Sequence, residues 1–318
     1  MNPRLTFALV ALLACALPAM AQKYPDRPVR IIVPFAAGTG TDILARILTE
    51  ELRTSMGATF VIDNRAGGSG QIAAELAARA NPDGYTLFLS TNTPHSANPF
   101  LFKKLNYDPI RDFAAVSRLI YYSFILAVNP NLGVKSTAEL IAYIKANPGK
   151  TSYAFGNSTG QVNGAYFASA AKLDSLPVPY KSTPPAMTDL IGGRVHWMFV
   201  DTASSQAHVK AGRLRALAVM GDKPSDAMPE LQPVGATVPG FDTLPWAGMF
   251  VPAGTPKHLI ARLNTEIVTA LEKPAIRQRL IDVGLLPDPS TPAELDRFVK
   301  QQLVTWGKKI RDAGIQPE

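Results

Sequence analysis

The sequence predicts an α/β protein built from two lobes, and three observations lead to that class. Short apolar segments with strand character alternate with longer segments of helical periodicity along most of the chain. The alternation falls into two separate series, one starting near Val29 and the other near Phe124. The chain has 318 residues, a length typical of about two domains.

The first series predicts half of a doubly wound sheet. An apolar strand over residues 29–35 is followed by helical periodicity over 41–56. A short strand over 60–63, a helix over 71–80 and a third strand over 85–90 follow. Strands that are joined by helices in this way pair in parallel, with right-handed connections.

The second series repeats the alternation and is followed by a helical tail. Strands are predicted over 124–128, 152–155, 178–180, 195–200 and 214–220, and helices over 136–146, 162–172, 184–191 and 204–211. After a proline-rich stretch over 221–244 come an extended run over 245–251 and helices over 257–271, 274–283 and 292–313. We expect the chain to cross between lobes near Phe124 and again near Ala247. The expected organisation is a signal peptide over 1–21, the first lobe over 22–124, the second lobe over 125–246, and a return to the first lobe over 247–318.

The first 21 residues have the three parts of a secretory signal peptide. Arg4 supplies the positive start, residues 5–18 form an apolar run, and Ala19-Met20-Ala21 is a cleavage motif. The run is shorter than the roughly 20 apolar residues that a membrane helix needs. We therefore expect export and cleavage after Ala21. Removing 21 of the 318 residues leaves 297, and losing Arg4 reduces the formal charge from +7 to +6.

Cysteine, histidine and charge exclude several classes of function. Cys15 is the single cysteine, so cleavage leaves a protein without disulfides or cysteine-ligated metals. A lipoprotein anchored through Cys15 is the alternative, but this cysteine lies early in the apolar run. The four histidines have no zinc-binding spacing, and no metal or cofactor is expected. The positive charge favours anions, but the chain has no dense basic stripe or nucleic-acid motif, and no nucleic-acid partner is expected.

Two polar loops follow strands and open helices, where backbone N–H groups and the helix dipole attract anions. The first is Phe35-Ala36-Ala37-Gly38-Thr39-Gly40-Thr41-Asp42, and the second is Gly156-Asn157-Ser158-Thr159-Gly160. The first lacks the third glycine of a dinucleotide fingerprint and the lysine of a phosphate loop. The first loop is also explained as a tight turn with Thr39 or Thr41 as the helix N-cap, whereas the second is unusually rich in donors for a simple connection. One such loop in each lobe predicts that both grip a single carboxylate across a cleft.

Asp201 directly follows the strand predicted over 195–200, at the edge where α/β proteins bind ligands. It can accept a hydrogen bond from an amine, a hydroxyl or a protonated part of a ligand. Capping the next helix is an equally good explanation.

A catalytic alternative uses the same residues. Gly156 to Gly160 spells G-x-S-x-G, the nucleophile-elbow pattern of serine hydrolases. Ser158 would be the nucleophile, followed in the required order by Asp201 and then His208 or His258. Against this interpretation, the pattern is short and the chain has no HGGG-type oxyanion segment.

Motifs along the whole chain beyond the signal peptide match one family. They include Tyr24-Pro25-Asp26-Arg27-Pro28, Gly38-Thr39-Gly40-Thr41-Asp42, Asp63-Asn64-Arg65-Ala66-Gly67-Gly68, Asn81-Pro82-Asp83-Gly84-Tyr85-Thr86, Ala146-Asn147-Pro148-Gly149-Lys150, Leu190-Ile191-Gly192-Gly193 and Pro252-Ala253-Gly254-Thr255-Pro256. On these motifs the sequence resembles the Bug, or TctC-like, periplasmic solute-binding receptors of tripartite tricarboxylate transporters.

The resemblance implies the type II periplasmic-binding-protein fold, a Venus flytrap whose lobes are each a doubly wound sheet flanked by helices. It implies a monomeric periplasmic receptor, not an enzyme, that holds a small carboxylate partly through water and delivers it to membrane permease subunits. Some members of the family present the ligand to a sensor kinase instead. The residues expected to contact the ligand are Phe35, Ala36, Ala37, Gly38, Thr39, Gly40, Thr41, Asp42, Ser90, Gly156, Asn157, Ser158, Thr159, Gly160, Tyr180 and Asp201.

This sequence departs from the family pattern at two places, which leaves the ligand's identity open. Many members have Pro-Gly-Gly where this chain has Ala36-Ala37-Gly38, and a His-Leu pair where it has Asn163-Gly164-Ala165. Aromatic acids, amino acids and citrate-like acids all fit the sequence. The aromatic residues Phe35, Tyr121, Tyr122 and Phe155 slightly favour a ring.

Overall fold

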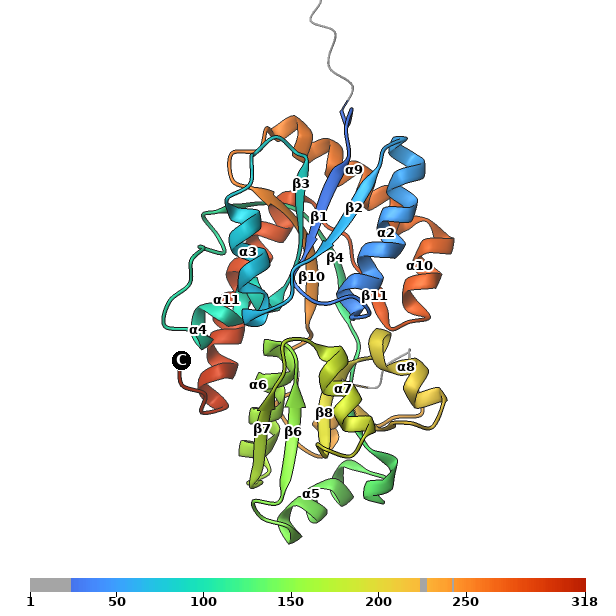
Figure 1. The fold of residues 1–318 in the computed structure, drawn as a ribbon, viewed down its shortest axis with the longest axis vertical. Coiled ribbons are helices and arrows are strands. Elements are labelled where there is room, and N and C mark those ends of the chain that lie inside the picture. Colours follow the sequence, from blue (N-terminus) through green and yellow to red (C-terminus); the bar gives the residue numbers. More distant parts are fainter. Residues whose placement is uncertain (1–23, 224–227, 242) are drawn as a thin grey trace, which may run out of the picture.

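A computed structural model describes residues 24–223, 228–241 and 243–318. The predicted signal peptide and its cleavage site after Ala21 lie outside the described residues. Two lobes are stacked along the long axis of the molecule, and each contains one mixed β-sheet with helices packed against it (Figure 1). The α/β class with two lobes is therefore confirmed.

The sheet of the first lobe takes strands from both ends of the chain. Its strands are β1 (Val29–Val33), β2 (Phe60–Asn64), β3 (Thr86–Thr91), β4 (Phe113–Tyr122), β10 (Trp246–Pro252) and β11 (Leu285–Pro287). Their order across the sheet is β11-β4-β10-β3-β1-β2. Strand β1 is parallel to β2 and β3, whereas β10 is antiparallel to β3 and β4. The C-terminal part of the chain is thus built into the first lobe.

The sheet of the second lobe repeats this plan. Its strands are β5 (Phe124–Val128), β6 (Thr151–Phe155), β7 (Ser175–Pro179), β8 (Trp197–Asp201) and β9 (Arg215–Val219), in the order β7-β6-β8-β5-β9. Strand β6 is parallel to β7 and β8, and β5 is antiparallel to β8 and β9. In the first lobe the antiparallel strand β10 lies between β3 and β4. In the second lobe the antiparallel strand β5 lies between β8 and β9.

The α-helices are α2 (Gly40–Met56), α3 (Gln71–Ala78), α4 (Asn98–Leu101), α5 (Thr137–Ala146), α6 (Ser158–Ala170), α7 (Thr183–Ile191), α8 (Thr202–Lys210), α9 (Lys257–Glu272), α10 (Pro274–Ile281) and α11 (Pro292–Asp312). A π-helical turn over Thr93–Ala97 links β3 to α4. Helix α2 shows why such segments fold: Thr39 caps its start, Gly57 ends it with φ 60°, and Leu44, Leu48 and Leu52 form its buried stripe. No helix within the described ranges is both long and apolar enough to cross a membrane.

Several features differ from the sequence prediction, among them the short strand β11 and the short helix α4, which were not predicted. Strand β4 was not predicted, because Ser117 and Arg118 interrupt its apolar residues and its partner β10 lies more than a hundred residues later in the chain. Helix α6 begins at Ser158, four residues before the predicted start, so most of the second polar loop is its first turn.

The chain passes between the sheets at two places. Strand β4 ends at Tyr122 and β5 begins at Phe124 in the other sheet, so Ser123 alone separates them. The second passage lies between Val219, the end of β9, and Trp246, the start of β10. Buried apolar contacts continue from the first sheet through Tyr122 and Phe124 into the second lobe. The junction of the lobes is therefore a packed region, and the site lies there.

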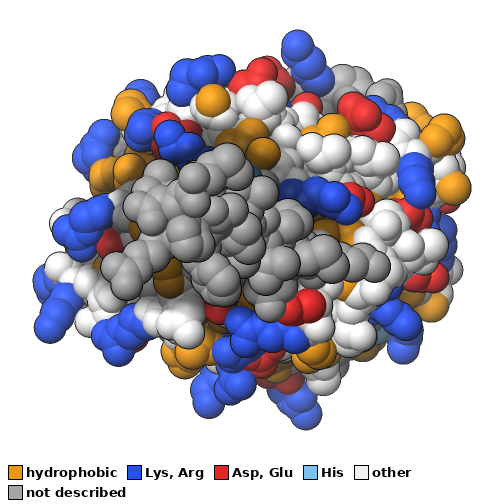
Figure 2. Space-filling model, turned by 90° about the horizontal axis from the view of Figure 1, so that it is seen from above, with side chains coloured by type: hydrophobic (Ala, Val, Ile, Leu, Met, Phe, Trp, Pro, Cys, Tyr) orange, Lys and Arg blue, Asp and Glu red, His pale blue; other side chains and the backbone are white. Residues whose placement is uncertain are grey.

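Charged side chains are mixed on the end of the first lobe. Figure 2 shows Lys and Arg dispersed over this face, with Asp and Glu between them. Several form ion pairs, including Lys273 with Glu51, 2.5 Å from Nζ to Oε1, and Arg279 with Glu50, 2.6 Å from Nη1 to Oε2. Exposed pairs of this kind add little stability, at most about 1 kcal/mol each.

Candidate functional site

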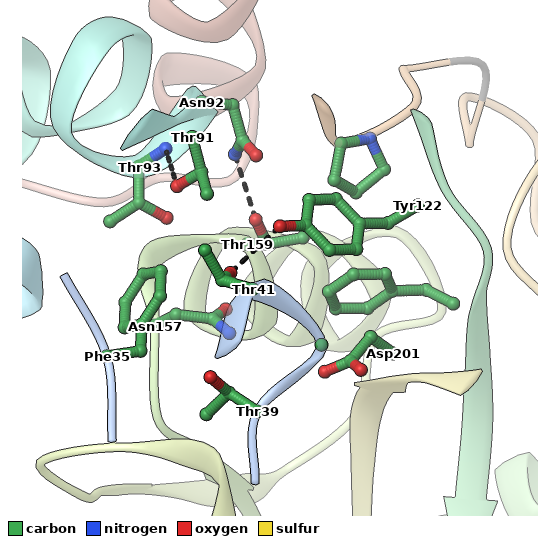
Figure 3. Close-up of a pocket in the computed structure, with 13 residues that line it drawn as sticks. Phe35, Thr39, Thr41, Thr91, Asn92, Thr93, Tyr122, Asn157, Thr159 and Asp201 are labelled. Carbon is green, nitrogen blue, oxygen red and sulfur yellow. Dashed lines mark hydrogen bonds between the residues drawn. The ribbon is translucent and has the colours of Figure 1, made fainter. Parts of the chain in front are cut away.

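A narrow pocket lies where the two lobes meet (Figure 3). Its lining residues are Phe35, Thr39, Gly40, Thr41, Thr91, Asn92, Thr93, Tyr122, Phe124, Asn157, Thr159, Asp201 and Pro245. The cavity itself has a volume of about 20 Å³. The lobes are thus packed closely around the pocket in this arrangement.

The first wall of the pocket is the start of α2. Thr39 Oγ1 accepts a hydrogen bond from the Asp42 N–H at 3.3 Å and donates one to the Ala36 carbonyl at 2.9 Å. Gly38 has a φ of 83°, a conformation that favours glycine, and its N–H donates to Asp42 Oδ2 at 3.0 Å. Burial alone would raise the pKa of Asp42, but hydrogen bonds from Arg46 and Gly38 hold it below its usual value. Asp42 therefore remains charged and ties down the loop in front of α2.

The second wall is the start of α6, in the other lobe. Asn157 is the N-cap, and its Oδ1 accepts a hydrogen bond from the Gly160 N–H at 2.8 Å. Gly156 packs against the backbone of Ser182, since an added Cβ would lie 2.2 Å from the Ser182 carbonyl carbon. Figure 3 shows Thr39 and Thr41 from the start of α2 close to Asn157 and Thr159 from the start of α6. Two helix N-termini, one from each lobe, thus line one pocket, an arrangement that attracts anions.

Asp201 lies at the end of β8 and links three elements. Its Oδ1 accepts a hydrogen bond from the Ser204 N–H at 2.9 Å, which makes it the N-cap of α8. Gly40 of the opposite lobe lies close to it, since an added Cβ on Gly40 would lie 2.5 Å from Asp201 Oδ1. Burial raises the pKa of Asp201, although the backbone N–H groups of Ser204 and Gly40 oppose the shift. The helix-capping interpretation is confirmed, and Asp201 also lines the pocket, where its contact with a ligand stays a prediction.

Direct hydrogen bonds join the lobes around the pocket. Asn92 Nδ2 donates to Thr159 Oγ1 at 2.8 Å, and Ser158 Oγ donates to Asn98 Oδ1 at 2.9 Å. The Ala36 N–H donates to Ser182 Oγ at 3.2 Å. The structure therefore shows the lobes in a closed arrangement.

The structure brings seven of the sixteen residues expected to contact the ligand into the lining of the pocket. These are Phe35, Thr39, Gly40, Thr41, Asn157, Thr159 and Asp201. The other nine lie outside the lining: Ala36, Ala37, Gly38, Asp42, Ser90, Gly156, Ser158, Gly160 and Tyr180. Most of these nine shape the two helix starts.

Ser90 and Tyr180 are held by other partners. Ser90 is fully buried, with its Oγ 2.7 Å from His95 Nδ1. The Tyr180 hydroxyl donates to Asp189 Oδ2 at 2.7 Å, on the surface of the second lobe. Both belong to the set expected to contact the ligand, but the structure places neither in the lining, and the residues that follow Ser90 line the pocket instead.

Six lining residues were absent from the predicted set. Thr91, the last residue of β3, and the following Asn92 and Thr93 form a third polar segment, which we call the β3 segment. The others are Tyr122, Phe124 and Pro245, which flank the two passages between the lobes. The signal in the sequence was a cluster of polar residues after a predicted strand, as in the two loops, but the β3 segment lacks their glycines.

The arrangement does not form the catalytic triad of the hydrolase alternative. Ser158 Oγ donates to Asn98, not to a histidine, and Asp201 caps α8. His208 lies in the last turn of α8, and His258 lies beside Tyr24 and Arg27 at a separate surface depression. Within the described ranges, no group of three His, Cys, Asp or Glu side chains could hold a metal ion.

A two-lobed α/β protein with two helix starts facing one interlobe pocket is a solute-binding protein of the periplasmic type. The family model described as "Tripartite tricarboxylate transporter family receptor" matches residues 44–315. The chain belongs to this family of receptors, which confirms the resemblance found in the sequence.

Named relatives agree with the family. The chain is 32% identical over 313 residues to the protein BugT of Bordetella pertussis, covering 96% of this chain and 95% of BugT. The solved structure of Rpa4515 of R. palustris with adipate is 34% identical, with a TM-score of 0.91, covering 93% of this chain and all of that one. MatC of Rhodopseudomonas palustris with bound malate is 29% identical, with a TM-score of 0.85, covering 90% of this chain and all of that one. The predicted periplasmic-binding-protein fold is therefore confirmed.

Proposed function

We propose that the protein is a periplasmic receptor that captures a small carboxylate between its lobes and delivers it to the permease subunits of a tripartite tricarboxylate transporter. The observation that carries the proposal is the pair of helix N-termini, α2 and α6, that line one pocket from opposite lobes. The partial positive charge and the unpaired N–H groups of each helix start favour an anion.

The charge of the lining is consistent with recognition through neutral groups. Among the lining residues that the structure describes there is no Lys, Arg or His, and Asp201 is the single acidic residue. A carboxylate would be held by backbone N–H groups and hydroxyls, whose hydrogen bonds gain strength once the closed lobes exclude water. A ligand that contacts both lobes binds the closed form more tightly than the open form and therefore shifts the population toward it.

Relatives support the class of ligand, since two proteins of similar fold are described with adipate and malate, both carboxylic acids. We further propose that the protein acts as a monomer, has no enzymatic activity, and is released to the periplasm by cleavage after Ala21. The proposed lobes are residues 22–124 with 247–318, and residues 125–246.

A thermal-shift screen of the purified exported protein tests the proposal. The panel contains small carboxylates and, for each, the uncharged amide of the same skeleton. An acid present at about 100 times its dissociation constant should stabilise the protein by roughly 2.7 kcal/mol and raise its melting temperature, while its amide should not. Recovery of the acid chemically unchanged would support a receptor over an enzyme, and the mass of the protein would test cleavage after Ala21. Equal shifts by acids and amides would contradict anion capture by the helix starts.

A further inference from the structure

Some polar groups of the pocket are not used by the two helix starts. These groups indicate what the ligand's second functional group is. Five threonines, two asparagines and Tyr122 contribute uncharged hydrogen-bonding groups to the lining. Thr39 Oγ1 is used in capping α2, and Thr41 Oγ1 is paired with the Tyr122 hydroxyl at 2.8 Å. The groups that retain hydrogen-bonding capacity toward the pocket lie mainly in the β3 segment and at Asp201.

The β3 segment offers both donors and acceptors. Thr91 Oγ1 accepts a hydrogen bond from the Thr93 N–H at 3.2 Å, which leaves the hydroxyl hydrogen of Thr91 available to donate. Asn92 donates through Nδ2 to Thr159, which leaves its Oδ1 as an acceptor. Among the described residues, none is hydrogen-bonded to Thr93 Oγ1, so this hydroxyl can do either. All three residues are almost completely buried.

Asp201 adds a carboxyl group to the lining, and among the described lining residues it has no cationic partner. Its Oδ1 accepts a hydrogen bond from the Ser204 N–H. A carboxyl group has further lone-pair positions, so acceptor capacity remains on a residue that is only 4% exposed. A donor on the ligand would form a hydrogen bond there.

We propose that the pocket selects a small hydroxylated carboxylate, whose hydroxyl is recognised by the β3 segment and Asp201. The inference rests on the proposed function and deepens it by naming the class of ligand. A hydroxyl group both donates and accepts, so it can pair with the threonine hydroxyls and with the Asp201 and Asn92 oxygens together. An ammonium group only donates, so it would leave the hydroxyl hydrogen of Thr91 unpaired. A carboxylate only accepts, so it would leave the Asn92 and Asp201 oxygens unpaired.

The closed form makes this selection effective. A buried polar group without a partner costs about 1–3 kcal/mol, because it loses its hydrogen bonds to water and gains none. An acid with a plain methylene at this position would close the lobes over unpaired threonine and asparagine groups. Sites built to bind a hydroxyl reject analogues that lack one much more strongly than apolar pockets reject an added methylene.

Isothermal titration calorimetry with two matched sets of acids tests the inference. The first set is propanoate, lactate and alanine, and the second is succinate, malate and aspartate. Within each set the carbon skeleton is constant and one hydrogen is replaced by a hydroxyl or an ammonium group. In at least one set, the hydroxy acid is expected to bind roughly tenfold more tightly than both of its analogues.

A variant assigns the preference to the β3 segment. Thr93→Val removes the hydroxyl at similar shape, and it should reduce the preference for the hydroxy acid over the unsubstituted acid to about threefold or less. Thr265→Val is the matched control, because Thr265 lies on an exposed face of α9 and its hydroxyl bonds only within that helix, to the Ala261 carbonyl. The control should keep the full preference.

The outcomes separate the inference from the proposed function. Binding of these acids without preference for the hydroxyl, or with preference for the ammonium compound, would overturn the inference and leave the carboxylate receptor intact. A preference that survives in Thr93→Val would overturn the role of the β3 segment. If none of the six acids binds, the inference is overturned, whereas the thermal-shift screen of acids against their amides decides the proposed receptor. The comparison of acids on the unaltered protein is decisive even if the valine variant fails to fold.

Discussion

His95 lies next to the β3 segment, in the core of the first lobe. Its ring stacks on Phe250 with 3.9 Å between the centroids, and its Nδ1 lies 2.7 Å from Ser90 Oγ. Complete burial lowers the pKa of His95 from 6.5 to about 3. The folded protein therefore keeps this imidazole neutral, and the neutral ring holds Ser90 immediately before Thr91.

Acidification should destabilise the protein through His95. Between about pH 6.5 and about pH 3, His95 is protonated in the unfolded chain but neutral in the folded chain. The free energy of unfolding should then fall by about 1.4 kcal/mol for each pH unit in this window. Between pH 7 and pH 5 the protein should lose about 2 kcal/mol more than the variant His95→Gln, which cannot titrate.

Urea unfolding of both proteins at the two pH values measures this difference. The pKa values of His196 and His208 are also lowered by burial, but both residues are present in each protein and their contributions cancel. The same pH dependence in the two proteins would show that His95 is accessible to protons in the folded state.

Position 156 requires glycine, because the backbone of Gly156 touches the backbone of Ser182. Replacing it with Ala would place a Cβ 2.2 Å from the Ser182 carbonyl carbon and 2.3 Å from the Thr183 nitrogen. Backbone atoms cannot move away as a flexible side chain can, so Gly156→Ala should lower the free energy of unfolding by roughly 1–3 kcal/mol. The matched control is Gly192→Ala, where φ is −76° and the nearest atom would be 3.4 Å away. Chemical denaturation should show a change within about 0.5 kcal/mol for the control.

At the scale of the element, the start of helix α6 can be tested through its N-cap, Asn157. Asn157→Asp keeps a good N-cap, because an aspartate oxygen can also accept the hydrogen bond from the Gly160 N–H. The substitution nevertheless places a negative charge in the lining, where the carboxylate is proposed to bind. Stability should stay within about 1 kcal/mol, whereas affinity for a carboxylate should fall at least about tenfold, since like charges a few ångströms apart repel strongly.

The same replacement at another helix start is the control. Ser136 caps α5, its Oγ accepts from the Glu139 N–H at 3.1 Å, and α5 contributes no residue to the pocket. Ser136→Asp should leave affinity unchanged. Calorimetry with the acid that gives the largest thermal shift compares the two variants. Equal affinities for Asn157→Asp and the unaltered protein would place the ligand's charge away from α6.

The elements also show what could be predicted from the sequence. The strands and helices with regular apolar periodicity were placed within a few residues, as in α2, which has a threonine cap and a leucine stripe. The start of α6 was missed because Ser158, Thr159 and Gly160 are weak helix formers. Its first turn depends on the hydrogen bond that the Gly160 N–H donates to Asn157 Oδ1, which compensates for that weakness. Strand β4 was missed because its order comes from pairing with β10, far along the chain.

At the scale of the whole molecule, the pocket exists because distant segments meet. The two polar loops could be predicted as walls of a site, since each follows a strand and carries small polar residues, although the start of α6 was placed four residues too late. Tyr122, Phe124 and Pro245 carry no such local signal and line the pocket because the chain passes twice between the sheets. The β3 segment meets α6 across the lobes, where Asn92 contacts Thr159. Local patterns in a sequence cannot specify contacts of this kind.

Closure itself can be tested at Gly40, the first residue of α2. In this closed arrangement an added Cβ would lie 2.5 Å from Asp201 Oδ1 in the opposite lobe and 3.3 Å from Tyr122 Cε1. Asp201 has little freedom to retreat, because it is buried and caps α8. With the lobes apart, the contact with Asp201 disappears, and alanine is the better helix former by up to about 1 kcal/mol. Gly40→Ala should therefore penalise the closed form and spare the open one.

The expected result is a separation of stability from affinity. A penalty of about 1–3 kcal/mol on closure lowers affinity for the carboxylate roughly five- to 150-fold, because the ligand must offset it to close the lobes. The melting temperature without ligand should change little, and small-angle scattering should show less compaction on adding ligand than in the unaltered protein. Gly192→Ala, at the end of α7 and outside the pocket lining, should retain both affinity and compaction. Unchanged affinity in Gly40→Ala would mean that the bound state does not need the contact between Gly40 and Asp201, and that the lobes close less tightly on the ligand than this arrangement indicates.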